Sequence, residues 1–238
     1  MLWDMGGVQL PNGCVIVTAA AGGIGEATAH AFAAIDPRVL LVDIDGEGLA
    51  RVAGEINTAT GAAVVPFVAD VTSPEGAEAV ATKAMDLFGR IGVLANVVGG
   101  SRPGKTVVDL PFEEWQTMLS LNLTSIFLLC KAVIPRMAEA GGGSIVNVSS
   151  GAGLRGMKAN PGYVAAKGGV VALTRSLAID HSAQGIRTNA VAPGPIRTPL
   201  MRRNRTPDEI ASMGSLALAG RIGEPEEIAA ALVWLASD

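Results

Sequence analysis

Tyr163 and Lys167 are the residues whose types and spacing most directly suggest chemistry. They stand four positions apart, so a helix would place both on one face. A tyrosine hydroxyl is a poor base at its ordinary pKa of about 10, but a neighbouring ammonium group favours the phenolate and lowers that pKa. Tyr163 is the only tyrosine in the chain, and Ser150 closes an apolar run upstream of it. An isolated pair would more often be a packed tyrosine beside a surface lysine, so general acid–base catalysis needs a second signal.

A glycine-rich segment and one aspartate supply that signal nearer the N-terminus. The segment TAAAGGIG covers residues 18–25 and overlaps the end of the apolar run CVIVTA. Glycines at such a turn let the backbone approach a pyrophosphate, and the helix that follows offers unpaired N–H groups. Asp43 closes the next apolar run, where a carboxylate can accept hydrogen bonds from a ribose diol. Either feature alone is often structural, but together they predict a dinucleotide site.

The elements that must position these residues follow from short apolar runs that alternate with helical patterns. Strands are expected at residues 14–19, 38–43, 63–70, 91–98, 144–150 and 186–192. Helices are expected from the glycine-rich turn to about Ile35 and at residues 47–60, 74–88, 112–140 and 163–183. The alternation predicts an α/β fold, a Rossmann-like doubly wound parallel sheet with helices on both faces. No linker or repeat divides residues 1–238, so we expect one domain that binds ligands at the carboxyl ends of its strands.

The composition excludes several classes of protein. Hydrophobic residues make up 49% of the 238 residues, so burial can offset the entropy lost on folding, and disorder is excluded. A net charge of −4 argues against nucleic acid or an anionic membrane as the main partner. Cys14 and Cys130 are the only cysteines, too few for a disulfide framework or a four-ligand zinc site. We expect no metal site.

The apolar character of the chain raises the question of a membrane span. The uncharged run at residues 5–25 contains Pro11 and six glycines, and the run at residues 115–130 is short and carries several polar side chains. Neither is expected to cross a bilayer as a helix. The first residues, MLWDMGG, hold an acid and no basic residue, so no signal peptide is predicted. The sequence therefore indicates a soluble protein of the reducing cytoplasm.

Motifs in a fixed order make the chain resemble the short-chain dehydrogenase/reductase family from about Pro11 to Asp238. The matching segments are TAAAGGIG, Asp70-Val71, NVVG at residues 96–99, Asn122-Leu123, Ser150, YVAAK at residues 163–167 and NAVAPGPIRT at residues 189–198. The resemblance implies an NAD-dependent oxidoreductase that interconverts a secondary alcohol and a ketone by hydride transfer. It also implies a small-molecule substrate and a homo-oligomer, a dimer or a tetramer.

The family's functional residues carry over onto matching positions of this chain. By that resemblance Tyr163 is the general acid/base, Lys167 lowers its pKa and binds the nicotinamide ribose, and Ser150 holds the substrate oxygen. Asn122 would anchor a water molecule in a proton relay, with its helix locally opened. The implied cofactor-binding residues are Thr18, Ala19, Ala21, Gly23, Ile24, Asp43, Asp70, Val71, Asn96, Tyr163, Lys167, Pro193, Ile196 and Thr198. Asp70 and Val71 would flank the adenine, and the Asn96 backbone would lie near a ribose.

Three departures from the family pattern bear on these expectations. Ala19 replaces the first glycine of the turn and adds a methyl group beside the expected pyrophosphate. Val97 replaces an asparagine that normally ties down the sheet. The sequence also ends at Asp238, before the last strand that the family normally adds, so we expect a sheet that lacks this strand.

Two features of the sequence are compatible with functions other than that of an oxidoreductase. The segment GGSRPGKT at residues 99–106 matches the phosphate-binding loop of nucleotide triphosphatases. Such a loop must open directly into a helix, whereas Pro111 and the cap-like residues from Asp109 delay the helix here. A catalytically inactive dinucleotide-binding or scaffolding protein would be consistent with Ala19 and Val97, although Asn122, Ser150, Tyr163 and Lys167 are all present.

Cofactor choice and assembly complete the expectations. Asp43 should accept hydrogen bonds from the adenosine ribose of NAD and repel the phosphate of NADP, since Ala20, Ala21 and Gly22 offer no cation in the turn. Residues 112–140 are apolar on too many sides for one buried face, which predicts an oligomer interface. His30 and His181 are expected to be surface residues of helices.

The substrate is expected to lie under a lid at about residues 195–220. Cations gather on this lid and on the loop that should face it, namely Arg155, Lys158, Arg202, Arg203 and Arg205. They suggest either an anionic or thioester substrate or a solvated basic surface, and the sequence leaves both open.

Overall fold

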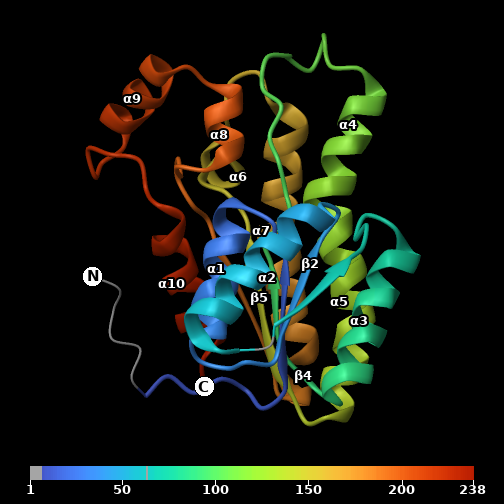
Figure 1. The fold of residues 1–238 in the computed structure, drawn as a ribbon. Helices are drawn as coiled ribbons and strands as arrows, with labels where there is room; N and C mark the ends of the chain where they lie inside the picture. The colour runs from blue at the N-terminus through green and yellow to red at the C-terminus, as the bar shows by residue number, and fades with distance from the viewer. Residues whose placement is uncertain (1–6, 63) are drawn as a thin grey trace.

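A six-stranded parallel sheet forms the centre of the protein (Figure 1). The computed structural model describes residues 7–62 and 64–238. The strand order is β3-β2-β1-β4-β5-β6, with every neighbouring pair parallel. The strands are β1 (Cys14–Thr18), β2 (Val39–Asp43), β3 (Val65–Val68), β4 (Ile91–Asn96), β5 (Gly143–Val148) and β6 (Ile186–Val191). The predicted doubly wound α/β fold is confirmed.

The alternation of side chains along each strand creates two cores, one on each face of the sheet. Val15 and Val17 of β1 belong to one buried cluster, and Cys14 and Ile16 belong to the other, because successive residues of a strand point to opposite faces. The first cluster is covered by α1 (Gly23–Ala33), α2 (Gly46–Thr60) and α10 (Pro225–Ala236). The second is covered by α3 (Pro74–Phe88), α5 (Ser125–Glu139) and α7 (Pro161–His181). Both cysteines are free and lie in this second cluster, where burial raises the pKa of each thiol to about 12.

The order of the strands creates a crevice at the carboxyl ends of β1 and β4. From β1 the chain winds outward through β2 to β3, and then returns to the centre to build β4, β5 and β6 on the other side. The loops that leave β1 and β4 therefore diverge, and ligands of such sheets bind where they part. Near this edge lie α4 (Phe112–Leu119), α6 (Gly151–Arg155), α8 (Pro199–Asn204) and α9 (Pro207–Leu216), the last two drawn in orange in Figure 1.

The long helix expected at residues 112–140 is divided by a π-helical turn. The segment η1 (Ser120–Thr124) separates α4 from α5 without breaking the helical path. The run Phe112–Glu139 is long and apolar enough, by length and composition alone, to cross a membrane. Half of its most apolar window is buried within the fold, and α5 packs on the sheet, so we interpret it as a core helix. The run extends beyond the uncharged stretch at residues 115–130 at both ends, because the helix also includes Glu113, Glu114 and Lys131.

The remaining boundaries differ from the expected ones at a few positions. The strand expected at residues 63–70 is confined to β3, and Ala63 itself lies outside the described residues. The short 3₁₀ turn η2 (Ser182–Gln184) follows α7 and leads into β6. Within the described residues β6 is an edge strand, and no further strand follows it. Arg187 of this strand donates hydrogen bonds to the carbonyls of Leu235, Ala236 and Ser237, which attaches the end of α10 to the sheet edge.

Candidate active site

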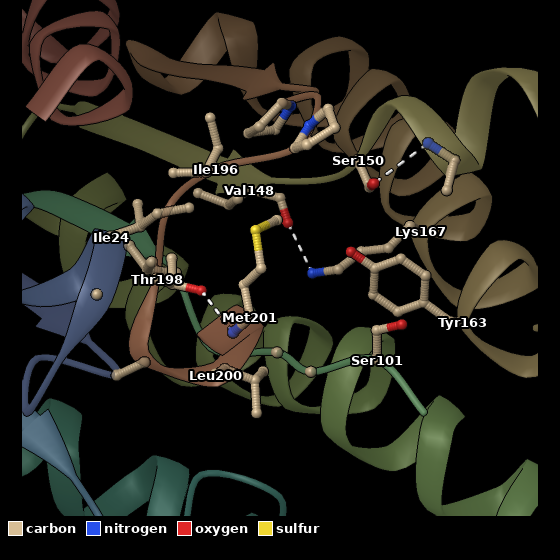
Figure 2. Close-up of a pocket in the computed structure, with 18 of the residues that line it drawn as sticks. Ile24, Ser101, Val148, Ser150, Tyr163, Lys167, Ile196, Thr198, Leu200 and Met201 are labelled. Atoms are coloured by element: carbon tan, nitrogen blue, oxygen red, sulfur yellow. Dashed lines mark hydrogen bonds between the residues drawn. The ribbon is translucent and has the colours of Figure 1, made fainter. Parts of the chain in front are cut away.

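A cavity of about 760 Å³ opens at the carboxyl edge of the sheet. It is lined by the segments that follow β1, β2, β4, β5 and β6, together with residues from α7, α8 and α9. Its volume lies in the range of small-molecule and cofactor sites. Figure 2 shows Ser150, Tyr163 and Lys167 on one side of this cavity and Ile24 and Thr198 on the other. The cavity therefore joins the two sites that the sequence predicts separately.

The glycine-rich turn brings the N-terminus of α1 to the cavity wall. A β-carbon on Gly25 would lie 1.9 Å from the carbonyl oxygen of Ala19, so only glycine permits the turn to close on the helix. Gly22 precedes the helix and supplies no side-chain cap, which leaves N–H groups of the first turn available to a ligand. Ala19 itself has a φ of +54°, a left-handed conformation that glycine adopts without strain and alanine does not.

Asp43 lies in the cavity wall at the end of β2, next to this turn. One carboxylate oxygen accepts a hydrogen bond from the Ala21 N–H at 3.1 Å. The other accepts from the N–H groups of Ile44 and Asp45, at 2.7 Å and 3.1 Å. These three backbone donors fix the carboxylate at the cavity wall, where it can also accept hydrogen bonds from hydroxyl groups of a ligand.

Lys167 is almost fully buried at the opposite end of the cavity. Its Nζ donates a hydrogen bond to the carbonyl oxygen of Val148 at 2.8 Å, and the hydroxyl of Ser149 binds the Lys167 carbonyl at 2.7 Å. Burial disfavours the charged form and lowers the pKa of Lys167 to about 8. The amine can therefore be protonated or neutral near neutral pH, as a proton carrier must be.

Tyr163 lies one helical turn before Lys167, on the same side of the cavity as Ser150 (Figure 2). Burial raises the pKa of Tyr163, and the nearby Ser150 hydroxyl offsets only part of that increase. Burial therefore sets the direction of this pKa in the protein alone, and the role of Lys167 in lowering it stays a prediction. Ser150 also caps α6, accepting a hydrogen bond from the Ala152 N–H at 3.2 Å (Figure 2).

Asn122 occupies the π-helical turn, the local opening that the family resemblance implies. Its Oδ1 accepts a hydrogen bond from the Gly100 N–H at 3.0 Å, and its Nδ2 donates to the carbonyls of Gly100 and Met118 at 2.9 Å and 3.0 Å. These bonds attach the helix to the loop that follows β4. Because a π-turn leaves a backbone carbonyl without its usual partner, it is a frequent feature of functional sites.

Comparisons with known proteins agree with this arrangement. A model of the family described as Enoyl-(Acyl carrier protein) reductase matches residues 18–238. D-threitol dehydrogenase from Mycolicibacterium smegmatis is 36% identical over 230 residues, covering 97% of this chain and 88% of that protein. The 3-oxoacyl-acyl-carrier-protein reductase FabG from Thermotoga maritima is 36% identical over 231 residues, covering 97% of this chain and 93% of that protein. The crystal structure of gox2181 matches with a TM-score of 0.91 at 31% identity, over 96% of this chain and 90% of that chain.

The chain belongs to the short-chain dehydrogenase/reductase family. It is therefore an oxidoreductase of this family, whose members generally use nicotinamide dinucleotides. The residues present fit such a cofactor. The uncapped start of α1, the glycine cradle at Gly25 and the carboxylate of Asp43 lie along one wall of the cavity, and the buried amine of Lys167 lies at its far end.

The cavity is lined by most of the predicted site residues. They are Ala19, Ala21, Gly23, Ile24, Asp43, Ser150, Tyr163, Lys167, Pro193, Ile196 and Thr198. Asp70 and Val71 follow β3 outside the cavity wall, and Asn96 and Asn122 are buried behind it. Val148 and Ser149 also contribute to the wall and could not be selected from the sequence, because they belong to no recognised motif.

The side chain of Thr18 lies within the sheet and outside the cavity wall. It is fully buried, and its hydroxyl donates to the Ala95 carbonyl at 3.4 Å and accepts from the N–H groups of Val97 and Val98 at 2.9 Å and 3.2 Å. Thr18 thus attaches the end of β4 to β1.

The segment that resembles a phosphate-binding loop does not have the required geometry. Thr106 leads into a turn, and the next helix, α4, begins only at Phe112. Lys105 is ion-paired with Glu114 of that helix instead of facing a nucleotide site. The family assignment and this geometry together exclude the triphosphatase interpretation.

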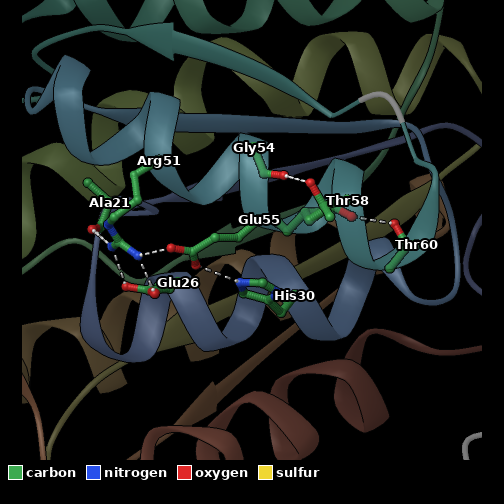
Figure 3. A network of polar contacts seen from close by, with 9 residues as sticks. Ala21, Glu26, His30, Arg51, Gly54, Glu55, Thr58 and Thr60 are labelled. Carbon is green, nitrogen blue, oxygen red and sulfur yellow. Dashed lines mark hydrogen bonds and ion pairs between the residues drawn. The ribbon is translucent and has the colours of Figure 1, made fainter.

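One group of potential metal ligands exists among the described residues, which the sequence analysis did not anticipate. Glu26 and His30 of α1 and Glu55 of α2 carry ligand atoms within 4.8 Å of one another. Arg51 is ion-paired with both carboxylates, and Figure 3 shows its guanidinium between them. A metal ion would have to displace this arginine, so the group is better described as an ion-pair network. His30 lies on the helix surface as predicted.

Proposed function

We propose that this protein is an NAD-dependent oxidoreductase that interconverts a secondary alcohol and a ketone, with Tyr163 as the general acid/base. The convergence of Ser150, Tyr163 and Lys167 at one end of a single cavity, with Asp43 and the glycine-rich turn at the other, carries the proposal. Proton transfer and dinucleotide binding can then occur in one continuous space. The buried Lys167 amine and the half-buried Tyr163 in one cavity wall support catalysis in preference to binding alone.

The chemistry of the chain's own residues follows from this arrangement. In alcohol oxidation, the Tyr163 oxygen removes the hydroxyl proton while the Ser150 hydroxyl orients the substrate oxygen; in ketone reduction the same proton is returned. The nicotinamide, when bound, accepts or delivers the hydride. Lys167, whose pKa of about 8 allows both protonation states, passes the proton away from Tyr163, and Asn122 holds a water molecule beside it.

We also propose that the cofactor is NAD in preference to NADP. Asp43 is held by three backbone N–H groups and can accept the ribose hydroxyls that NAD offers. Asp45 lines the same end of the cavity, so a ribose phosphate would meet two carboxylates. Like charges in a partly desolvated groove cost several kcal/mol, or about a hundredfold in affinity.

The charges lining the two ends of the cavity favour an anionic group on the substrate. Within the described residues the only acids in the wall are Asp43 and Asp45, at the ribose end. The wall also includes Arg155, Arg203 and Arg205, whereas Arg202 lines a separate cavity and Lys158 lines neither. Arg205 is paired with Glu209, and the other two make no ion pair among the described residues. We propose that residues 195–220 act as the lid that brings Arg203 over the substrate.

A homo-oligomer, a dimer or a tetramer in the cytoplasm, completes the proposal. Phe112 and Phe127 are exposed on the α4–α5 run although both are large and apolar, which is expected of a face that a second copy covers. Gly169 of α7 packs against Leu123 of the same chain, since a β-carbon on Gly169 would lie 2.8 Å from the Leu123 side chain. Light scattering at micromolar concentration should give a mass above that of one chain.

The deciding experiment measures reduction of NAD and of NADP with a panel of neutral and anionic secondary alcohols. We expect turnover with NAD at a kcat/KM at least a hundred times that with NADP. The Asp43→Ala variant should narrow this ratio, chiefly by losing NAD affinity. Comparable efficiency with both cofactors in the parent would remove the role of Asp43, and no turnover with any pair, despite NAD binding, would favour the inactive binding protein.

A further inference from the structure

Arg51 of α2 contacts the glycine-rich turn through a set of contacts that no motif indicates. Its guanidinium donates two hydrogen bonds to the carboxylate of Glu26 on α1, at 2.9 Å and 2.8 Å, and one to Glu55 at 2.9 Å. A further N–H donates to the carbonyl oxygen of Ala21 at 3.1 Å. Figure 3 shows Arg51 between the two helices, with Ala21 at one side. The guanidinium thus fastens α2 to α1 and to the turn between β1 and α1.

Ala21 connects this arginine to Asp43. The carbonyl of Ala21 accepts from Arg51, and the N–H of the same residue donates to Asp43 Oδ2 at 3.1 Å. The cation and the ribose-binding carboxylate are therefore separated by the backbone of one residue. The packing is close here, since a β-carbon on Gly48 would lie 2.8 Å from the Ala21 β-carbon. Movement of Arg51 would change the peptide orientation that fixes Asp43.

The electrostatic balance around Arg51 determines which cofactor this end of the cavity can accept. A cation beside a ribose usually admits a ribose phosphate, since guanidinium groups bind phosphate bidentately. Here Glu26 already occupies that bidentate face and Glu55 takes another N–H, so the three side chains together are net negative. Asp43 and Asp45 add two more carboxylates. Arg51 does not itself line the cavity, and its hydrogen bond to the Ala21 carbonyl is what places it directly behind the cavity wall.

We propose that the Glu26–Arg51–Glu55 network sets cofactor specificity, and that Arg51 is a positioning residue for Asp43. In this arrangement Glu26 keeps the guanidinium away from a 2′-phosphate, while Arg51 holds Ala21 so that Asp43 faces the ribose hydroxyls. The inference rests on the proposed use of a nicotinamide dinucleotide. The rejection of NADP would then depend on the network between α1 and α2 as well as on Asp43 at the end of β2.

The test removes the charge of Glu26 and measures binding in the absence of substrate. Glu26→Gln keeps the shape of the side chain but removes its charge and one of the two oxygens that hold the bidentate face of Arg51. Titration calorimetry should then show NADP affinity rising about tenfold or more, with NAD affinity changing less than about threefold. The double variant Glu26→Gln/Arg51→Met should lose the gain for NADP, because the gain depends on the guanidinium. Arg51→Met alone should weaken NAD binding several-fold through the loss of positioning.

The control and the contrary outcomes separate this inference from the proposed function. Glu78→Gln removes a comparable interhelical partner, that of Arg136 between α3 and α5, and should leave both affinities unchanged. Exposed ion pairs contribute little to stability, so all variants should fold, which circular dichroism would verify. If the parent binds NAD but Glu26→Gln leaves the NAD-to-NADP ratio unaltered, or if the double variant keeps the gain, the inference is wrong while the function stands. If the parent binds neither dinucleotide, both are wrong.

Discussion

Asn122 and Lys167 approach the same point beside the backbone of Gly99. A β-carbon built on Gly99 would lie 2.7 Å from Asn122 Oδ1 and 2.8 Å from Lys167 Nζ. The two polar atoms are thus close enough for a single water molecule to bridge them. The glycine of the NVVG segment leaves open the space through which Lys167 and Asn122 would exchange a proton with solvent.

The first prediction follows from that space. Gly99→Ala should lower kcat at least tenfold, because the added methyl group displaces Lys167 or the bridging water. Gly100→Ala is the matched control, since its β-carbon would meet its nearest neighbour, Leu121, only at 3.4 Å. Steady-state kinetics on both folded variants would check this. An equal loss of kcat in Gly99→Ala and Gly100→Ala would indicate that the loop is disturbed, and that the space between Lys167 and Asn122 is not responsible.

A second prediction concerns the proton acceptor. Tyr163→Phe should reduce turnover to below about a hundredth of the parent value, because the phenyl ring has no group to exchange the substrate proton. NAD binding, measured by calorimetry, should remain within about threefold of the parent. Retained activity above that hundredth would show that another group carries the proton.

A third prediction uses the pKa of Lys167, which burial lowers to about 8 in the folded protein. The unfolded chain, with an ordinary lysine, binds more protons between this value and its own pKa of about 10.4, so the contribution of Lys167 to the free energy of unfolding rises with pH in that window. From about pH 7.5 to about pH 9.5 the parent should gain about 1–2 kcal/mol relative to Lys167→Met. Urea unfolding at both pH values measures this difference. The same pH slope for both proteins would mean that the amine is not desolvated.

Much of this fold could be predicted because its signals are local. The alternation of Val15 and Ile16 assigns each side chain to one face of the sheet, and Asp43 had to lie at the ligand edge once β2 was recognised. The four-residue spacing of Tyr163 and Lys167 needs only one helix. These inferences depend on a few consecutive residues and on the geometry of regular elements.

The features that could not be predicted depend on packing between distant segments. Arg51 and Glu26 are 25 positions apart, and only the docking of α2 against α1 brings them together. The spacing of Tyr163 and Lys167 does not reveal how far burial disfavours the phenolate, so the raised pKa of Tyr163 in the protein alone could not be predicted from it. Thr18 belongs to a recognised motif, yet its hydroxyl faces β4 and not the cavity.

A fourth prediction concerns Ala19, which replaces glycine at a φ of +54°. Ala19→Gly should stabilise the protein by about 0.5–1 kcal/mol, since relief of about 1–2 kcal/mol of strain exceeds the added entropy of the unfolded chain. It should also raise NAD affinity by removing a methyl group beside the expected pyrophosphate. Ala159 has a φ of +52° but does not line the cavity, so Ala159→Gly should stabilise similarly and leave NAD affinity unchanged. Urea unfolding and calorimetry would measure the two effects separately, and equal NAD affinities for both variants would remove the steric argument.

The last prediction concerns the charge of the substrate. The guanidinium of Arg155 lies over the start of α6, where a β-carbon on Gly151 would be 3.2 Å from it, and Gly151 directly follows Ser150. A carboxylate or phosphate on the substrate could therefore reach Arg155 while its reacting oxygen is bound by Ser150. Arg155→Met keeps the length and apolar contacts of the side chain but removes the charge. It should lower kcat/KM for anionic alcohols about tenfold or more, chiefly through KM, and leave neutral alcohols within about twofold. Lys158→Met removes a nearby charge that lies outside the cavity wall, and it should leave kcat/KM unchanged for both classes of alcohol. Equal effects of Arg155→Met on both classes of substrate would mean that this arginine belongs to a solvated basic surface, with no role in recognition.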